Sequence, residues 1–205
     1  MNPENALREI SAGAVPLDLR PPARFAAGHV GGAVALQFNR ADLAERAELY
    51  LPTEERYVLF ADNDVIARTA EEILHHAGFD IAGYVEGGVA AWSDADLPTQ
   101  VLSSISIDDV GDPSLKIVDV REPFEYDFAH IAGALLHPST QSWYLHDQLP
   151  AKVRLAFVCA DEVRSAYVAS LALRQGKDAR LVLGGMSEWI NRSLPTEGNR
   201  VAIAN

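Results

Sequence analysis

The sequence contains a single cysteine, Cys159, among 205 residues. One cysteine cannot form an internal disulfide, and it cannot supply the several thiolates of a multi-cysteine metal site, so we expect no metal. Basic residues are also scarce, with 17 Lys and Arg against 29 Asp and Glu, which gives a formal net charge of −12. This balance argues against partners that are nucleic acids or anionic membrane surfaces.

Long apolar runs are missing as well. No stretch reaches the roughly 18 consecutive apolar residues that a membrane-spanning helix needs. The segment MNPENALREI carries acidic residues and lacks an apolar centre, so we do not interpret it as a signal peptide. We therefore expect a cytoplasmic protein in which Cys159 is a free thiol.

The chain does contain an internal repeat, which predicts two tandem domains. Asp18, Arg20 and His29 in the first half match Asp119, Arg121 and His130 in the second half, at an offset of 101 residues. Further along, the motifs Gly87-Gly88 and Trp92 match Gly184-Gly185 and Trp189 at an offset of 97. Hydrophobic residues make up 48% of the chain, enough for a core in each half. We place the domains at residues 1–102 and 103–205, because polar Ser103-Ser104 follows the end of the first repeat.

Each half alternates short apolar runs with a helical pattern. Runs of this length are typical of buried parallel strands, and they lie at 15–19, 57–60 and 81–85 in the first half and at 116–120, 155–158 and 180–183 in the second. A helix is predicted to end before Gly78 in the first half, and another to run over 164–175 and end at Gly176 in the second. This alternation predicts an α/β fold with a mainly parallel sheet flanked by helices in each domain.

Cys159 directly follows the apolar run 155–158 and precedes the predicted helix. A lone cysteine in such a place is most often a small buried hydrophobe. Ligands of parallel α/β sheets bind at the carboxyl ends of the strands, however, and the unpaired N–H groups of a helix N-terminus favour an anion there. We expect these groups, together with Arg164, to favour the thiolate form of Cys159, which is the nucleophilic form.

Taken together, these segments resemble the rhodanese superfamily in its tandem form. The resemblance is carried by Val118-Asp119-Val120-Arg121-Glu122-Pro123-Phe124-Glu125-Tyr126, His130-Ile131-Ala132-Gly133-Ala134, Cys159 to Ser165, Gly184-Gly185 and Trp189. It implies a sulfurtransferase whose loop of six residues, 159–164, begins at the nucleophile Cys159. Its implied partners are a small sulfur donor, a thiol acceptor and in some cases a protein acceptor, and it implies no cofactor.

The resemblance also implies roles for individual residues. Cys159 attacks a sulfane sulfur and holds it as a persulfide, which is covalent catalysis in two steps. Substrate binding falls to Ala160, Asp161, Glu162, Val163, Arg164 and Ser165. Asp119 and Arg121 are expected to support the loop structurally.

Two features depart from the family pattern. Glu162 stands where sulfurtransferases often have a glycine, and Asp161 precedes it. Two carboxylates near a thiolate oppose its ionisation and repel anionic donors such as thiosulfate, unless they point outward to water. The first half also lacks the cysteine: counting forward from its strand puts Ala61 at that position, and counting back from Arg68 puts Asn63 there.

Two other functions remain open. Phosphatases and arsenate reductases of the same fold place one more residue between cysteine and arginine than the four between Cys159 and Arg164, so a tetrahedral oxyanion fits poorly here. The acidic loop also disfavours a dianion. The second alternative is a non-catalytic binding or sulfur-relay docking protein in which Cys159 is idle, because a fold does not by itself imply an activity.

Overall fold

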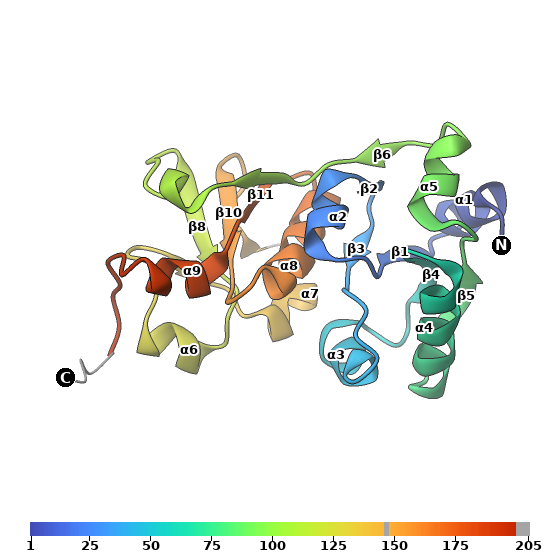
Figure 1. The fold of residues 1–205 in the computed structure, drawn as a ribbon, viewed down its shortest axis with the longest axis horizontal. Coiled ribbons are helices and arrows are strands. Elements are labelled where there is room, and N and C mark those ends of the chain that lie inside the picture. Colours follow the sequence, from blue (N-terminus) through green and yellow to red (C-terminus); the bar gives the residue numbers. More distant parts are fainter. Residues whose placement is uncertain (146–147, 200–205) are drawn as a thin grey trace. The chain divides into compact units, whose positions relative to one another are not determined.

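A computed structural model describes residues 1–145 and 148–199 of the chain (Figure 1). Its internal contacts divide the chain into two units, Met1–Leu102 and Ser103–Asn205. Within the described residues, no helix is long and apolar enough to cross a membrane.

Unit 1 is built on a parallel sheet of four strands in the order β3-β1-β4-β5. The strands are β1 (Val15–Asp18), β3 (Val34–Ala35), β4 (Arg56–Phe60) and β5 (Asp80–Tyr84). The helices that accompany them are α1 (Pro3–Ser11), α2 (Pro22–Ala27), α3 (Leu43–Tyr50), α4 (Asp64–His76) and α5 (Gly88–Asp94). A short antiparallel pair, β2 (His29–Val30) with β6 (Thr99–Gln100), completes the unit.

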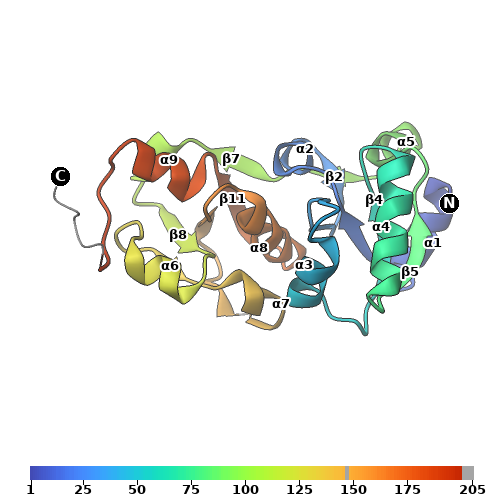
Figure 2. The same cartoon turned by 60° about the horizontal axis from the view of Figure 1, so that its bottom comes forward.

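Unit 2 contains a parallel sheet of five strands in the order β7-β11-β10-β8-β9. The strands are β7 (Ser103–Ile105), β8 (Leu115–Asp119), β9 (Leu135–Leu136), β10 (Arg154–Val158) and β11 (Asp178–Val182). The α-helices are α6 (Pro123–Phe128), α7 (Ser142–Leu145), α8 (Val163–Arg174) and α9 (Gly185–Asn191), with 3-10 turns η1 (Ile107–Asp109) and η2 (Ser139–Gln141). Figure 2 shows the helices of each unit beside its sheet.

The mainly parallel α/β architecture predicted from the sequence is confirmed in both units. The predicted strands and the helix over 164–175 lie within about two residues of the observed bounds, as expected for elements defined by periodicity. The apolar runs were clear in the sequence because the residues that form them are buried on both faces of the sheet or along the helix. Residues 155–158 of β10 are fully buried, and α8 buries every residue from Ser165 to Ala172.

The sheet of unit 2 brings two chain segments together at the carboxyl ends of its strands. β8 and β10 are parallel neighbours, and Asp119 is paired in register with Val158. Beyond the last pair, the N–H of Val120 donates to the carbonyl of Val158 at 2.9 Å. The turn that follows β8 and the loop that begins at Cys159 therefore leave the sheet side by side.

Candidate active site

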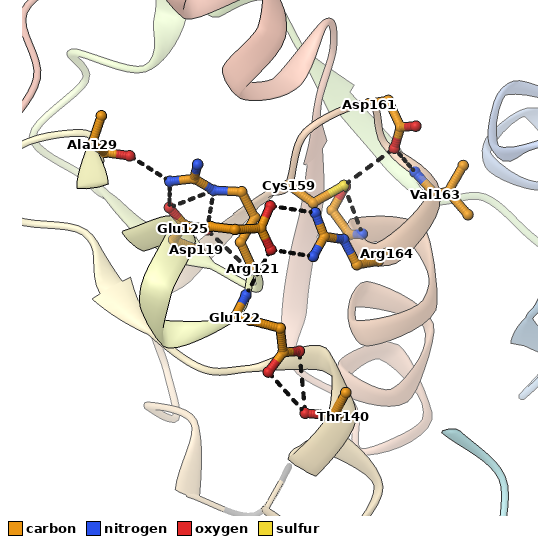
Figure 3. A network of polar contacts seen from close by, with 11 residues as sticks. Asp119, Arg121, Glu122, Glu125, Ala129, Thr140, Cys159, Asp161, Val163 and Arg164 are labelled. Carbon is orange, nitrogen blue, oxygen red and sulfur yellow. Dashed lines mark hydrogen bonds and ion pairs between the residues drawn. The ribbon is translucent and has the colours of Figure 1, made fainter. Parts of the chain in front are cut away.

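Cys159 is the first residue after β10, and its side chain is directed at the beginning of α8 (Figure 3). The Sγ atom accepts the backbone N–H of Ser165 at 3.3 Å, and the Ser165 hydroxyl lies 3.4 Å from it. That hydroxyl also donates to the carbonyl of Glu162 at 3.1 Å. Cys159 is fully buried. The sulfur therefore lies against the first turn of a helix of 12 residues, where free N–H groups favour an anion.

The carbonyls of the loop are held by α9. The N–H of Met186 donates to the Cys159 carbonyl at 2.7 Å, and the N–H of Ser187 donates to the Ala160 carbonyl at 3.1 Å. Gly185 makes this approach feasible, because a Cβ at that position would lie 2.5 Å from the Cys159 oxygen and 2.6 Å from the Ala160 oxygen. The backbone of Gly185 also has φ +55°, a conformation that glycine adopts readily.

Both loop carboxylates accept backbone N–H groups: Asp161 from within the loop, and Glu162 from the turn before α9. Asp161 is exposed; its Oδ1 accepts the N–H of Val163 at 3.3 Å and lies 3.9 Å from Cys159 Sγ. Glu162 has φ +82°, which accounts for the glycine that many relatives are expected to have here. Its carboxylate accepts the N–H of Gly184, so it ties the loop to the turn before α9 instead of pointing into water.

Arg164 has a different partner from the one expected. Its guanidinium forms two hydrogen bonds with the carboxylate of Glu125 on α6, at 2.6 and 2.9 Å. The sequence did not indicate this partner, and the expectation that Arg164 favours the Cys159 thiolate stays a prediction. The Arg164 guanidinium also holds the pKa of Glu125 below its usual value, through its hydrogen bonds to the carboxylate.

Asp119 and Arg121 form a buried ion pair at the end of β8. Arg121 Nη2 binds Asp119 at 2.6 Å and donates to the Ala129 carbonyl at 2.7 Å. These hydrogen bonds connect the turn after β8 with the end of α6. None of these hydrogen bonds reaches the 159–164 loop itself, so the structural support expected from this pair stays a prediction.

Comparison with known proteins decides the family. The family model of the rhodanese-like domain matches residues 2–95 and 106–192. The chain belongs to the rhodanese family.

Individual relatives cover one or both of its rhodanese-like units. The thiosulfate sulfurtransferase GlpE of Pseudomonas entomophila (strain L48) is 34% identical over 93 residues, which are 45% of this chain and 82% of the relative. A rhodanese-related protein from Thermoplasma volcanium has 28% identity and a TM-score of 0.45, covering 47% of this chain and 99% of its own. The crystal structure of a "probable thiosulfate sulfurtransferase" has 25% identity and a TM-score of 0.43, covering 90% of this chain and 97% of its own.

The first rhodanese-like unit has alanine at the position that corresponds to Cys159. Ala61 follows β4 directly, and its carbonyl lies against Gly88 just as the Cys159 carbonyl lies against Gly185. Asn63, the other candidate from the sequence, instead caps α4 by accepting the N–H of Ile66. The structure therefore selects Ala61 as the counterpart of Cys159.

Sequence reasoning missed two features of the rhodanese site. The first is Glu125, which lies inside the quoted motif but was given no role, although its repeat partner Arg24 carries the opposite charge. The second is the hydrogen bond of Glu162 with Gly184, which joins residues 22 positions apart. In the described part of the chain, no group of three or more His, Cys, Asp or Glu side chains is placed to hold a metal ion.

Proposed function

We propose that this protein is a sulfurtransferase that carries sulfane sulfur as a persulfide on Cys159. The observation that carries the proposal is the contact of Cys159 Sγ with the Ser165 N–H at the first turn of α8. A thiolate and a persulfide anion are both favoured at such a helix terminus. The family membership and the name of the Pseudomonas relative support the same chemistry.

The proposed reaction has two displacement steps. In the first, the Cys159 thiolate attacks the outer sulfur of a donor such as thiosulfate. The S–S bond of the donor breaks, its electron pair leaves with sulfite, and Cys159 becomes a persulfide anion. In the second step, an acceptor thiolate attacks the outer sulfur of the persulfide, takes it as a new persulfide and releases the Cys159 thiolate. No net oxidation takes place, and neither step needs a cofactor.

The partners in this proposal are a small sulfur donor and a thiol acceptor, which can also be a thiol of another protein. Because Cys159 is buried, a donor reaches the sulfur in this proposal only when neighbouring side chains move aside. The cytoplasmic location expected from the sequence stays a prediction.

The intact mass of the protein tests the proposal. After brief incubation with thiosulfate or an organic thiosulfonate, we expect the parent chain to gain the mass of one sulfur atom and to lose it when a thiol is added. The Cys159→Ser variant is nearly isosteric, so it should fold like the parent but take up no sulfur. A parent chain that stays unmodified with every donor, or a serine variant that still turns over, would overturn the proposal.

Two observations favour a second candidate, a non-catalytic rhodanese-like docking protein. Cys159 is fully buried, and the Asp161 carboxylate lies 3.9 Å from its sulfur, where it opposes the anionic form. In this case the cysteine is a core residue and no donor reaches it. The same mass measurement separates the two candidates.

A further inference from the structure

The ion pair between Glu125 and Arg164 joins α6 to the beginning of α8. Arg164 is the second residue of that helix, and its side chain and that of Glu125 are both 22% exposed. A cation at a helix N-terminus is unfavourable, because that end of the helix carries a partial positive charge. Glu125 neutralises this cation and, with two hydrogen bonds, fixes its direction (Figure 3).

Unit 1 also contains an ion pair between its short helix and the loop after β4, with the charges reversed, although the loop residue Asp62 stands at the place of Ala160 and not of Arg164. Arg24 on α2 corresponds to Glu125 on α6, since each lies in the helix that follows the first Asp-x-Arg motif of its unit. Arg24 binds the carboxylate of Asp62 at 2.8 Å, and Asp62 lies in the loop after β4. In both units, therefore, an ion pair joins the short helix, α2 or α6, to the segment that follows the central strand, β4 or β10.

The signs of the charges on helix and loop are exchanged between the two units, but each pair still joins the short helix to the loop. Ala61 takes the place of the cysteine in unit 1, so the pair of Arg24 and Asp62 has no thiol to influence. What both units retain is a link between helix and loop, whereas the sign of the charge on the loop side differs. We therefore attribute to the pair of Glu125 and Arg164 a role in positioning the 159–164 loop, independent of the sign of the charge on the loop.

We propose that Glu125 is a positioning residue for the reaction of Cys159. By binding Arg164 it fixes the end of the 159–164 loop and the first turn of α8, which carries the N–H groups that face the sulfur. The inference rests on the proposed function. It differs from the sequence-based hypothesis, in which the charge of Arg164 acts on the sulfur itself.

A double-mutant cycle with a charge exchange tests this proposal. The variants are Glu125→Ala, Arg164→Ala, the double alanine variant, and the exchange Glu125→Arg with Arg164→Glu. For each we would measure the single-turnover rate of persulfide formation, kcat and KM with thiosulfate, and the rate at which iodoacetamide alkylates Cys159. Arg24→Ala is the matched control, because it breaks the corresponding pair in the unit without the cysteine.

Positioning predicts a specific pattern in this cycle. Each single alanine variant should lower kcat about tenfold, in line with the sensitivity of reactions to small misplacements, and should change KM less than about twofold. The double alanine variant should be no slower than either single one, because the two residues act as one unit. The exchange variant should recover to within about threefold of the parent, and Arg24→Ala should stay within about twofold.

Two results would overturn the proposal. One is a rate in Glu125→Ala equal to that of the parent. The other is an exchange variant that unfolds at the temperature of the parent yet stays as slow as the single variants, since Arg164 would then act through its charge. A parent chain that accepts no sulfur refutes the proposed function alone. The alkylation rates still decide the role of Glu125 in that case: both single alanine variants should depart from the parent rate in the same direction and by a similar factor, and the exchange variant should restore the parent rate.

Discussion

At Cys159, opposite electrostatic influences act on one sulfur atom. The Ser165 N–H and the N-terminus of α8 favour an anion, whereas the Asp161 carboxylate lies 3.9 Å away and disfavours it. Two unit charges at this separation interact by about 1 kcal/mol in bulk water and by several times more at a partly buried site. Asp161 is exposed, so its influence on the thiolate is near the lower figure, but it also repels anionic donors, and a dianion more than a monoanion.

Neutralising Asp161 should therefore make thiosulfate a better donor. In Asp161→Asn the side-chain oxygen that accepts the Val163 N–H is kept, so the loop conformation is preserved while one negative charge is removed. For a dianion some 6–8 Å away, we expect kcat/KM to rise about threefold to tenfold, and the gain to shrink at high salt. Methanethiosulfonate, a monoanion that donates sulfur in the same way, should gain about twofold to threefold.

Equal gains with the two donors, or no gain with thiosulfate, would show that Asp161 does not select donors by charge. Glu162 is less suitable for this test. Its carboxylate holds the Gly184 N–H and its backbone is in the left-handed region, so a substitution there changes the loop as well as its charge.

His29 in unit 1 provides a pH-dependent contribution to stability. It is buried and stacked on Phe25, and burial lowers its pKa below the ordinary 6.5 because the imidazolium form is poorly solvated. The unfolded chain therefore takes up a proton at a higher pH than the folded chain does. The contribution of His29 is complete above pH 6.5 and is lost as the pH falls below that value.

We expect His29→Asn to remove this part of the acid sensitivity while keeping, at the place of Nδ1, a donor for the Phe25 carbonyl. Urea unfolding at about pH 7.5 and about pH 5.5 measures it: the free energy of unfolding should fall less on acidification in the variant than in the parent. An unchanged difference between the two pH values would contradict the assignment.

At the scale of elements, the 159–164 loop contacts the N-termini of two helices. α8 presents the Ser165 N–H to the sulfur, and α9 binds the carbonyls of Cys159 and Ala160 from the other side. With its carbonyls bound in this way, the loop is held in one backbone conformation. Gly185 allows the contact, since any side chain there meets both carbonyl oxygens.

Gly185→Ala should therefore damage both the fold and the reaction. We expect a loss of about 2 kcal/mol or more in stability, from strain at positive φ and from the clash, together with a drop of more than about tenfold in persulfide formation. Gly88→Ala is the matched control, because its Cβ would meet the Ala61 carbonyl in the unit without the cysteine. It should cost similar stability but leave persulfide formation within about twofold of the parent. A fully active Gly185→Ala variant would show that α9 does not hold the loop.

At the scale of the whole molecule, each rhodanese-like unit forms a complete sheet from its own strands. Unit 2 uses β7 to β11, and the first of these begins at Ser103, where the contacts divide the chain. Its core includes Ile117, Ala156 and Val182, one from each central strand. A unit of about 100 residues with its own sheet and core is large enough to fold independently.

We predict that a fragment of residues 103–205 folds cooperatively and forms the Cys159 persulfide. A fragment of residues 1–102 should fold as well but take up no sulfur. Circular dichroism during thermal unfolding and intact mass after incubation with a donor measure both properties. A 103–205 fragment without a cooperative transition would show that unit 2 depends on unit 1 for its stability.

The duplicated α/β fold and the place of Cys159 at a strand end could be predicted from the sequence. Strand and helix periodicities are local properties, and the repeat offset of 101 residues aligned the two units without any structure. The cysteine position followed for the same reason, because one apolar run ends at Val158 and a helical pattern begins soon after it.

The groups that surround the sulfur could be identified only from the three-dimensional structure. Arg164 binds Glu125, 39 positions away, although the sequence pointed to its neighbour Cys159. Glu162 binds the Gly184 N–H, and the choice of Ala61 over Asn63 depended on the approach of Gly88. The packing of helices at the carboxyl ends of the strands determines such partners. A side chain that could reach several residues pairs with the one that this packing brings within hydrogen-bond distance.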